Sequence, residues 1–369
     1  MRICFLILNP FDFDSRARFI CQDILSSGWK LDIIATDGGE LNSFGEAPIH
    51  RFPQPVKPFR QRRFIDFNIR AASLAGKLKA DIYHAVDLDT LWAAVKASKA
   101  CKAKIIYESR ELYTEQYSLY KRPAAKAFWR NLEKRLIKKA DAVVAVNESI
   151  ANELVNRYSI NRPKIVMNAA KIDETAQPIN LRQKYNLASK YILIFQGILR
   201  SGQGLTRSLE AIAGLPDVSL VIVGDGPNRP SLEKQADELG LKERIRFVGK
   251  VSPDQLKNYT AGADAGLMLI KPQALNSYLA LPQKLFQYIA AGVPPIISDL
   301  PEMRKIVRQD NLGLVIKNGS VESDINTIDG FLQNNLEAAA KTCHTEGKKY
   351  NWENEGLKML EVYRNLIDD

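Results

Sequence analysis

Long apolar runs are missing from this chain of 369 residues, and so are cysteine or histidine clusters. No apolar run reaches the roughly 18 residues that a membrane-spanning helix needs. The cysteines lack CxxC spacing and partner histidines, so we expect reduced, structural thiols in a cytosolic protein rather than disulfides or a metal site. The first ten residues, MRICFLILNP, lack a small-residue cleavage site and therefore predict a buried first strand rather than a signal peptide. The cysteines are Cys4, Cys21, Cys101 and Cys343.

Two common phosphate-binding signatures are absent as well. Gly202-x-Gly204 and Gly224-x-Gly226 each lack the third glycine of the dinucleotide fingerprint, and the chain contains no Walker A sequence. A ribose-binding acid in the spacing of that fingerprint is also lacking. These absences argue against a nicotinamide-dependent oxidoreductase.

The overall composition is that of a soluble globular protein, with 46% apolar and 25% charged residues. A chain of 369 residues is too long for one ordinary core and predicts two domains. The net charge of +10 is uneven and gathers in one segment.

That segment runs from Lys121 to Lys139 and contains a single acid, Glu133. Its apolar face, which includes Phe128 and Trp129, makes it a basic amphipathic helix. Such a helix is typical of a membrane-surface element, but a solvated helix packed on the domain by the same apolar stripe explains it equally well. No recognised binding motif accompanies the charge, so we expect no nucleic-acid partner. The basic residues are Lys121, Arg122, Lys126, Arg130, Lys134, Arg135, Lys138 and Lys139.

Apolar strand-like runs alternate with helical patterns along the whole chain, which predicts parallel sheets covered on both faces. The pattern lapses in a polar stretch around 167–187 and then restarts, so we place a domain boundary near 170–188. The predicted architecture is two consecutive doubly wound α/β domains. The predicted strands are Ile3–Leu8, Lys30–Thr36, Ile82–Val86, Lys104–Tyr107 and Ala142–Asn147 in the first, and Tyr191–Phe195, Ser219–Val223, Ile245–Val248, Ala265–Leu269 and Pro295–Ser298 in the second.

The segment LPQKLFQYIAAGVPPIISDLPE at 281–302 predicts a helix that opens at Pro282, stops at Gly292 and leads into a short strand. A helix N-terminus has free N–H groups and a partial positive charge, which suit a phosphate. Lys284 strengthens that preference, and Gln287, one turn further on, offers a hydrogen bond without charge. The segment therefore predicts a nucleoside-diphosphate site.

Two further loops follow strands of the same predicted domain, where ligands bind in doubly wound sheets. The loop 195–204 contains Gly197 and Arg200, so the backbone can approach a phosphate and the guanidinium can clamp it. The loop 223–227, VGDGP, forms a tight turn. Any one glycine is more often a turn residue than a ligand site, but three loops at one sheet edge favour phosphate binding.

In combination these motifs resemble the family 4 glycosyltransferases of the GT-B fold. The resemblance rests on FQG…G at 195–204, VGDGP at 223–227, RFVGKVS at 246–252 and PQKLFQYIAAGVPPIISDLPE at 282–302. YHAVDLDTL at 83–91 and YESRELYTE at 107–115 are similar to one bacterial branch that often serves surface-polysaccharide or glycolipid assembly. YNWENEGLKMLEVY at 350–363 is similar to the family's last helix, which braces the first domain.

The resemblance implies a domain for each substrate, with transfer in a cleft between two Rossmann-like domains. Residues 1–175 would bind the acceptor, residues 176–350 the nucleotide-sugar donor, and the helix in 351–369 would return to the first domain. Retaining transfer in this family needs no metal or cofactor, because basic side chains and helix dipoles stabilise the leaving diphosphate.

Individual roles are implied by the same resemblance. The catalytic set would be Asp87, Glu111, Arg200 and Lys284, with Arg16 on the acceptor side. The base would lie near Lys250 and Val251, the diphosphate against Gly197 and the helix that Pro282 opens, and the ribose at residue 287. The donor-binding set would be Gly197, Gln203, Gly224, Gly226, Lys250, Val251, Leu285 and Gln287.

The chain departs from the family pattern at three positions. Gln287 replaces a Glu that grips the ribose, Gln203 replaces a cation that contacts the diphosphate, and Val86 replaces a histidine before the aspartate. A charge-assisted phosphate contact contributes about 1.5–3 kcal/mol. Arg200 or Arg207 would have to supply the missing charge at residue 203.

Two residues in the first domain have competing interpretations. Asp87-Leu88-Asp89 matches a DxD metal motif of the other glycosyltransferase fold, but we favour a substrate-facing or helix-capping aspartate. His84 lies on a predicted strand, and we expect it to be packed or hydrogen-bonded rather than catalytic.

The sequence thus predicts a glycosyltransferase that moves a sugar from a nucleotide sugar, UDP- or GDP-linked, to a cell-surface polysaccharide or lipid-linked acceptor. The basic helix at 121–139 would bring a cytoplasmic protein to the anionic inner face of a membrane. The alternative is a catalytically weak, glycosyltransferase-like binding or partner subunit, which the three departures support.

Overall fold

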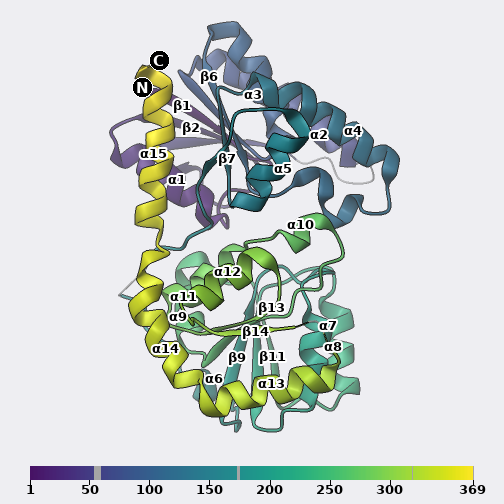
Figure 1. Ribbon diagram of the computed structural model, residues 1–369. Coiled ribbons are helices and arrows are strands. Elements are labelled where there is room, and N and C mark those ends of the chain that lie inside the picture. Colours follow the sequence, from purple (N-terminus) through teal and green to yellow (C-terminus); the bar gives the residue numbers. More distant parts are fainter. Residues whose placement is uncertain (54–59, 173–174, 318, 369) are drawn as a thin grey trace. The chain divides into compact units, whose positions relative to one another are not determined.

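The computed structural model describes residues 1–53, 60–172, 175–317 and 319–368. The chain divides into two compact units (Figure 1). The first unit combines Met1–Met167 with Glu353–Asp369, and the second is Asn168–Trp352. The chain therefore passes between the units twice, after Met167 and again after Trp352. Residue 369, the last of the predicted C-terminal segment, lies outside the described residues.

The first unit is built on a sheet with strand order β3-β4-β2-β1-β5-β6-β7-β8. Of the strand pairs described, β3–β4 is antiparallel and the others are parallel. The chain builds outward from β1 on one side and then restarts with β5 on the other, so the order reverses between β1 and β5. The strands are β1 (Arg2–Leu6), β2 (Lys30–Thr36), β3 (Ser43–Phe44), β4 (Ala47–Phe52), β5 (Ile82–Val86), β6 (Lys104–Ser109), β7 (Ala142–Ala145) and β8 (Lys164–Ile165).

Helices cover both faces of this sheet, which explains why its central strands are apolar along their whole length. All five residues of β5 are buried, and β1 is buried from Ile3 onward. The helices are α1 (Ser15–Ser26), α2 (Arg60–Leu78), α3 (Leu88–Cys101), α4 (Pro123–Leu136), α5 (Glu148–Tyr158) and α15 (Trp352–Asp368), with short 3₁₀ turns η1 (Tyr113–Glu115), η2 (Tyr117–Leu119) and η3 (Ile137–Lys139).

The second unit has a parallel sheet with strand order β11-β10-β9-β12-β13-β14. Here the order reverses between β9 and β12. The strands are β9 (Tyr191–Gln196), β10 (Val218–Val223), β11 (Ile245–Gly249), β12 (Ala265–Met268), β13 (Pro295–Ser298) and β14 (Leu314–Ile316). The helices are α6 (Leu181–Tyr185), α7 (Leu205–Ala213), α8 (Arg229–Glu238), α9 (Pro253–Ala261), α10 (Leu275–Tyr278), α11 (Gln283–Ala290), α12 (Pro301–Gln309), α13 (Val321–Asn334), α14 (Leu336–Thr345) and the turn η4 (Glu346–Lys349).

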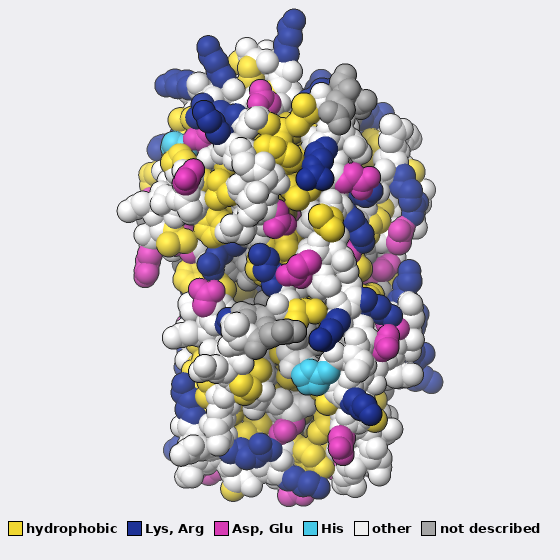
Figure 2. Space-filling view, turned by 90° about the vertical axis from the view of Figure 1, so that its left-hand side faces the viewer, with side chains coloured by type: hydrophobic (Ala, Val, Ile, Leu, Met, Phe, Trp, Pro, Cys, Tyr) yellow, Lys and Arg dark blue, Asp and Glu magenta, His cyan; other side chains and the backbone are white. Residues whose placement is uncertain are grey.

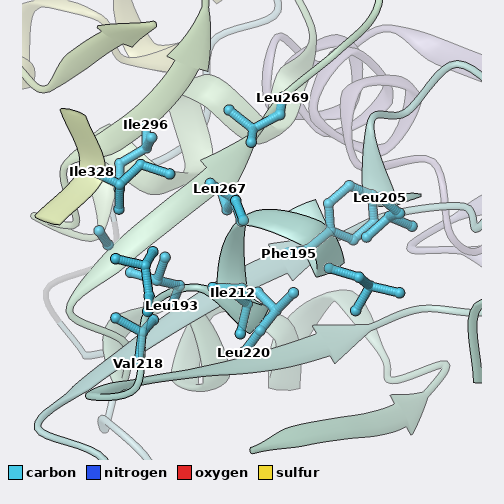
Figure 3. Packing of buried hydrophobic residues seen from close by; sticks show 14 of the residues in the cluster. Leu193, Phe195, Leu205, Ile212, Val218, Leu220, Leu267, Leu269, Ile296 and Ile328 are labelled. Atoms are coloured by element: carbon cyan, nitrogen blue, oxygen red, sulfur yellow. The ribbon is translucent and has the colours of Figure 1, made fainter. Parts of the chain in front are cut away.

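The core of the second unit lies between the sheet and helices α7 and α13 (Figure 3). Leu193 and Phe195 of β9 are buried with Ile212 of α7 and Ile328 of α13. This packing fixes β9 at the centre of the unit, and the loop that follows β9 is therefore held on a rigid support.

The last helix, α15, belongs to the first unit. Its Tyr363 is fully buried, and its hydroxyl lies 2.6 Å from Nδ1 of His84 on β5. Its Glu361 pairs with Lys164 of β8 at 2.6 Å. The fold predicted from the sequence, two parallel doubly wound sheets with a C-terminal helix that returns to the first domain, is confirmed.

Candidate functional site

Helix α11 is fastened to the end of β9 by one buried tyrosine. The Tyr288 hydroxyl accepts from the backbone N–H of Gln196 at 3.3 Å and donates to the carbonyl of Ile194 at 3.2 Å. Gly266 makes room for the ring, since a Cβ there would lie 2.3 Å from it. Pro282 occupies the N-cap with an extended backbone. The N-terminal turn of α11 is thus held beside the loop after β9, near the point where the strand order reverses.

Lys284 lies in this first turn and carries its amine over the end of β9. Nζ donates to Oε1 of Gln203 at 2.8 Å and lies 4.1 Å from the ring centroid of Phe195. A Cβ on Gly197 would lie 3.6 Å from Nζ, so the amine lies close to that exposed backbone. Burial, with a smaller contribution from the charge of Arg200, lowers the pKa of Lys284 to about 7. In the described part of the chain no carboxylate forms an ion pair with this amine.

The three predicted phosphate loops meet at the same edge of the sheet. The N–H of Gly197 donates to the carbonyl of Val223, and the N–H of Gly224 donates to the carbonyl of Gly249, at 2.9 and 2.8 Å. Gly224 has φ 137°, and a Cβ there would lie 2.0 Å from the carbonyl oxygen of Gly197. A Cβ on Gly226 would lie 2.4 Å from the carbonyl oxygen of Leu199. The packing of one loop against another therefore already requires glycine at 224 and 226.

The other predicted donor-site residues differ in exposure. Arg200 and Lys250 are exposed, and Val251 is partly exposed. Leu285 is fully buried, and its N–H donates to the carbonyl of Pro282, so its side chain faces the core.

The cation missing at residue 203 is not supplied by Arg207. Its guanidinium forms a two-armed ion pair with Asp324, at 2.5 and 2.6 Å. Gln203 itself holds the amine of Lys284. The positive charge near this loop therefore comes from Lys284 and Arg200.

In the first unit Asp87 stands where β5 ends and α3 begins. Its backbone has φ 58° and ψ 172°, a region that residues other than glycine occupy only at a cost. It takes the N-cap position of α3, yet its side chain caps nothing in that helix. Instead its carboxylate accepts from the backbone N–H and from Nε of Arg110, at 3.0 and 3.3 Å. Nη1 of Arg110 also donates to both carboxylate oxygens of Asp14, at 3.0 and 2.8 Å.

Burial and neighbouring acids raise the pKa of two carboxyl groups at this site, Asp87 and Asp89. Burial raises the pKa of Asp87 to about 6; Arg110 opposes the rise and Glu111 adds to it. Burial and the charge of Asp87 raise the pKa of Asp89 well above its ordinary value. Glu111 accepts from Nε2 of Gln116 at 2.8 Å. Within the described ranges no group of three or more His, Cys, Asp or Glu side chains is arranged to hold a metal ion.

Arg16, on the first turn of α1, belongs to a buried hydrogen-bond network in the same unit. Its Nε donates to Oε1 of Glu108 at 2.6 Å, and its two Nη atoms donate to the carbonyls of Met167 and Val166, at 2.5 and 3.0 Å. The other oxygen of Glu108 lies 3.1 Å from Nε2 of His84. Although burial pushes the pKa of Glu108 upward, Arg16 and His84 hold it well below its ordinary value. The structure thus places Arg16 at the point where the chain leaves the first unit, and places His84 in a packed, hydrogen-bonded position.

The distribution of charged side chains differs between parts of the surface. On the face drawn in Figure 2, basic and acidic side chains are interspersed. On α4 and η3, by contrast, Lys134, Arg135, Lys138 and Lys139 are exposed. Phe128 of the same helix is 52% exposed.

The two interpretations of the basic helix each describe part of it. Trp129 packs against Phe64 and Tyr113, with ring centroids 4.8 and 5.1 Å apart. Lys126 and Arg130 pair with Glu115 at 2.5 and 2.8 Å. One side of the helix is therefore packed on the unit, while its C-terminal basic residues remain exposed.

Three residues in or beside these sites were not predicted from the sequence. Gln196 bonds to Gln287, Thr260 bonds to Gln196, and Arg110 joins Asp14 to Asp87. Polar residues at the ends of buried strands were the available signal for Gln196 and Arg110, whereas Thr260 lies on a helix and carries no such signal.

Comparison with known families gives a consistent result over most of the chain. Residues 17–169 match the family Glycosyltransferase Family 4, and residues 178–350 match Glycosyl transferases group 1. An α-D-kanosaminyltransferase of Streptomyces kanamyceticus is 23% identical over 278 residues, covering 71% of this chain and 69% of that protein. A GDP-mannose-dependent α-(1-6)-phosphatidylinositol monomannoside mannosyltransferase of Mycobacterium tuberculosis is 29% identical over 154 residues, 40% of each chain.

Solved structures show the same fold over the full length. Sucrose-phosphate synthase from Thermosynechococcus elongatus aligns with a TM-score of 0.82 at 18% identity, covering 100% of this chain and 99% of that one. Anabaena Alr3699/HepE, in complex with UDP-glucose, aligns with a TM-score of 0.77 at 17% identity, covering 99% and 100%. At such identities the likeness shows the fold alone.

Proposed function

Because the chain belongs to the family 4, group 1 glycosyltransferases, which use nucleotide sugars, we propose that it transfers a sugar to a cell-surface polysaccharide or lipid-linked acceptor. The second unit is then the donor domain and the first unit the acceptor domain. The observation that carries the donor assignment is Lys284, whose amine has no anionic partner in the described residues at the end of β9. Lys284 is partly buried. An ammonium that has lost part of its hydration is costly unless an anion compensates it, and a diphosphate supplies that anion.

The donor lies along the sheet edge of the second unit in this proposal. The diphosphate lies at the N-terminus of α11, against the backbone of Gly197, with Lys284 and Arg200 as its cations. The base lies near Lys250 and Val251, and Gln287 faces the ribose. UDP and GDP are the candidate nucleotides, since the Anabaena structure holds UDP-glucose and the mycobacterial relative is named as GDP-mannose-dependent.

The reaction requires stabilisation of the leaving diphosphate as its bond to the sugar breaks. Lys284, Arg200 and the dipole of α11 supply positive charge where negative charge develops. Retention of configuration and independence of metal are carried over from the family.

The acceptor assignment rests on the edge of the first sheet. Asp87 and Glu111 follow β5 and β6 next to the reversal of strand order, where an acceptor hydroxyl would find carboxylate oxygens. The strained backbone of Asp87 supports a functional role, because strain of this kind collects at functional sites. Arg16 acts indirectly here, by holding Glu108 and the chain segment at Val166 and Met167.

A parallel titration with UDP, GDP and ADP tests the donor assignment, since a bound ligand raises the unfolding temperature by mass action. We expect one of the three to raise it in the wild type, and Lys284→Ala or Arg200→Ala to weaken that rise. The same two variants should also turn over the nucleotide-sugar donor more slowly than the wild type. If none of the nucleotides stabilises the protein, or if the stabilisation is unchanged in both variants, the donor assignment is wrong.

The basic end of α4 brings the enzyme to an anionic membrane surface in this proposal. The mycobacterial relative's named acceptor is a phosphatidylinositol mannoside, which supports a lipid-linked acceptor. No helix within the described ranges is both long and apolar enough to cross a bilayer. Attachment in this proposal rests on exposed lysines and arginines together with Phe128, the combination that binds anionic lipid surfaces.

Vesicle sedimentation tests the membrane proposal. We expect uptake onto phosphatidylserine-containing vesicles that added salt reverses, and loss of that uptake when Lys134, Arg135, Lys138 and Lys139 are neutralised. A matched control neutralises the exposed lysines Lys242, Lys271, Lys317 and Lys341 of the second unit. Equal uptake by the two variants would contradict the proposal.

A further inference from the structure

The family usually has a carboxylate at residue 287. In this chain the residue is Gln287, and a buried side chain, Gln196, donates a hydrogen bond to its amide. Nε2 of Gln196 donates to Oε1 of Gln287 at 2.6 Å. Gln196 is 1% exposed and lies at the last position of β9. Its own Oε1 accepts from the hydroxyl of Thr260 at 2.7 Å. That hydroxyl also lies 2.9 Å from the carbonyl of Leu256, one turn earlier on α9.

The hydrogen bonds from Thr260 to Gln196 and from Gln196 to Gln287 form a relay that connects three elements of the second unit. Thr260 belongs to α9, Gln196 to β9 and Gln287 to α11, and both Thr260 and Gln196 are buried. A buried amide must have its hydrogen bonds satisfied, so Gln196 has little freedom to turn away. The Tyr288 hydroxyl, which joins α11 to the backbone of Gln196 and Ile194, fixes the same two elements next to the relay.

The relay determines what Gln287 offers to a ligand. Its Oε1 is occupied by Gln196, and among the described residues none accepts from its Nε2. The amide therefore presents N–H donors, whereas a carboxylate would present acceptors. The lone pairs of a sugar hydroxyl can accept such a donor.

We propose that Gln196 and Thr260 are positioning residues, which hold Gln287 so that its amide donates to a ribose hydroxyl oxygen of the donor nucleotide. The inference rests on the proposed function, because it takes residue 287 to face the ribose. In this account the buried relay compensates for the missing carboxylate by geometry: the amide is fixed before the ligand arrives, and less side-chain entropy is lost on binding.

The relative affinity for ribose and deoxyribose nucleotides tests this inference. We would titrate the full-length protein with UDP, 2′-deoxy-UDP and 3′-deoxy-UDP, and with the guanosine series in parallel. The wild type should bind the ribonucleotide roughly fivefold more tightly than at least one deoxy analogue, the effect of one neutral hydrogen bond. In Thr260→Val and Gln196→Met that ratio should fall to below about twofold. Gln287→Glu should keep the preference, because a carboxylate still accepts from Gln196 and also accepts from a hydroxyl.

A matched control separates positioning from general damage. Thr342 on α14 donates to the carbonyl of Ala338, four residues earlier, and the hydroxyl of Thr260 lies in the same way beside the carbonyl of Leu256. Thr342→Val therefore removes a similar helical bond without touching the relay, and it should leave the ratio at the wild-type value. Loss of stability alone would weaken all the nucleotides together and leave the ratio unchanged.

The outcomes distinguish the two proposals. If the wild type binds a ribonucleotide but does not discriminate against either deoxy analogue, the positioning role is wrong and the donor assignment stands. If it discriminates and Thr260→Val and Gln196→Met discriminate equally well, the relay has no positioning role. If UDP, GDP and ADP all fail to bind, the donor assignment fails and the inference fails with it.

Discussion

Both units contain arginine or lysine at the end of their central strands, but the two sets of cations are compensated differently. In the first unit, Arg16 is paired with Glu108, and Arg110 is paired with both Asp14 and Asp87. In the second unit no carboxylate of the described residues pairs with Lys284, whose closest polar contact is a neutral amide.

The difference indicates which charges hold the fold and which await a ligand. A buried ion pair whose hydrogen bonds are satisfied keeps its elements in place, and removing one partner leaves an uncompensated charge. A cation with a strongly lowered pKa in a loop cluster is a candidate for ligand binding. Arg16 is thus assigned to the structure of the first unit, and Lys284 to the donor.

The largest effect is expected when the buried ion pair of Arg16 and Glu108 in the first unit is broken. Arg16→Met leaves the buried Glu108 without its cation and removes the donors to the carbonyls of Val166 and Met167. We expect the free energy of unfolding, measured with urea, to fall by about 3–5 kcal/mol. Arg70→Met is the control, since the exposed pair of Arg70 and Asp66 should contribute less than about 0.5 kcal/mol. Equal losses in the two variants would contradict the role assigned to Arg16.

A smaller effect is expected when Lys284 of the second unit is replaced. It should change ligand binding rather than folding. Lys284→Met should weaken nucleoside-diphosphate affinity by about 10- to 150-fold, the value of a charge-assisted contact of about 1.5–3 kcal/mol. Calorimetry measures the affinity, and urea unfolding should show that the variant stays folded. Lys284→Arg keeps the charge and should retain most of the affinity. A nucleotide affinity that is unchanged in Lys284→Met would remove this residue from the donor site.

The smallest effect concerns the backbone of Asp87. Asp87→Gly and Asp87→Ala both remove the carboxylate, but only glycine adopts φ 58° and ψ 172° without strain. The greater entropy of glycine in the unfolded chain offsets part of the gain. We therefore expect the glycine variant to be about 1 kcal/mol more stable than the alanine variant in urea unfolding. An alanine variant that is the more stable of the two would show that the backbone here is not strained.

The regular parts of the fold were predictable because buried parallel strands are apolar along their whole length. The predicted bounds of Lys30–Thr36, Ile82–Val86 and Pro295–Ser298 agree with β2, β5 and β13. The segment before β5 was not predicted: α2 begins with a basic run and β4 is interrupted by polar residues, so neither shows a clear period.

The sites were predictable only as positions along the chain, because partners distant in sequence decide what each residue does. Glu133 stands out in the sequence as the one acid in a basic helix. In the structure it is fully buried, and it accepts from the hydroxyls of Tyr107 and Tyr158 at 2.7 and 2.6 Å. Likewise the sequence places Arg207 near the diphosphate loop, but the structure pairs it with Asp324, 117 residues away.

The proton balance of donor binding tests the central claim, that Lys284 is the uncompensated cation of the donor site. Its pKa is about 7 in the free protein, and a bound diphosphate would raise that pKa. Below pH 7 the amine is charged with or without ligand; above pH 7 binding must take up a proton, so affinity falls as the pH rises.

Calorimetry at pH 8, in two buffers of different ionisation enthalpy, counts the protons taken up when the nucleoside diphosphate binds. We expect an uptake approaching one proton in the wild type and close to none in Lys284→Arg, whose guanidinium stays charged throughout. The same uptake in both proteins, or none in the wild type, would contradict the account.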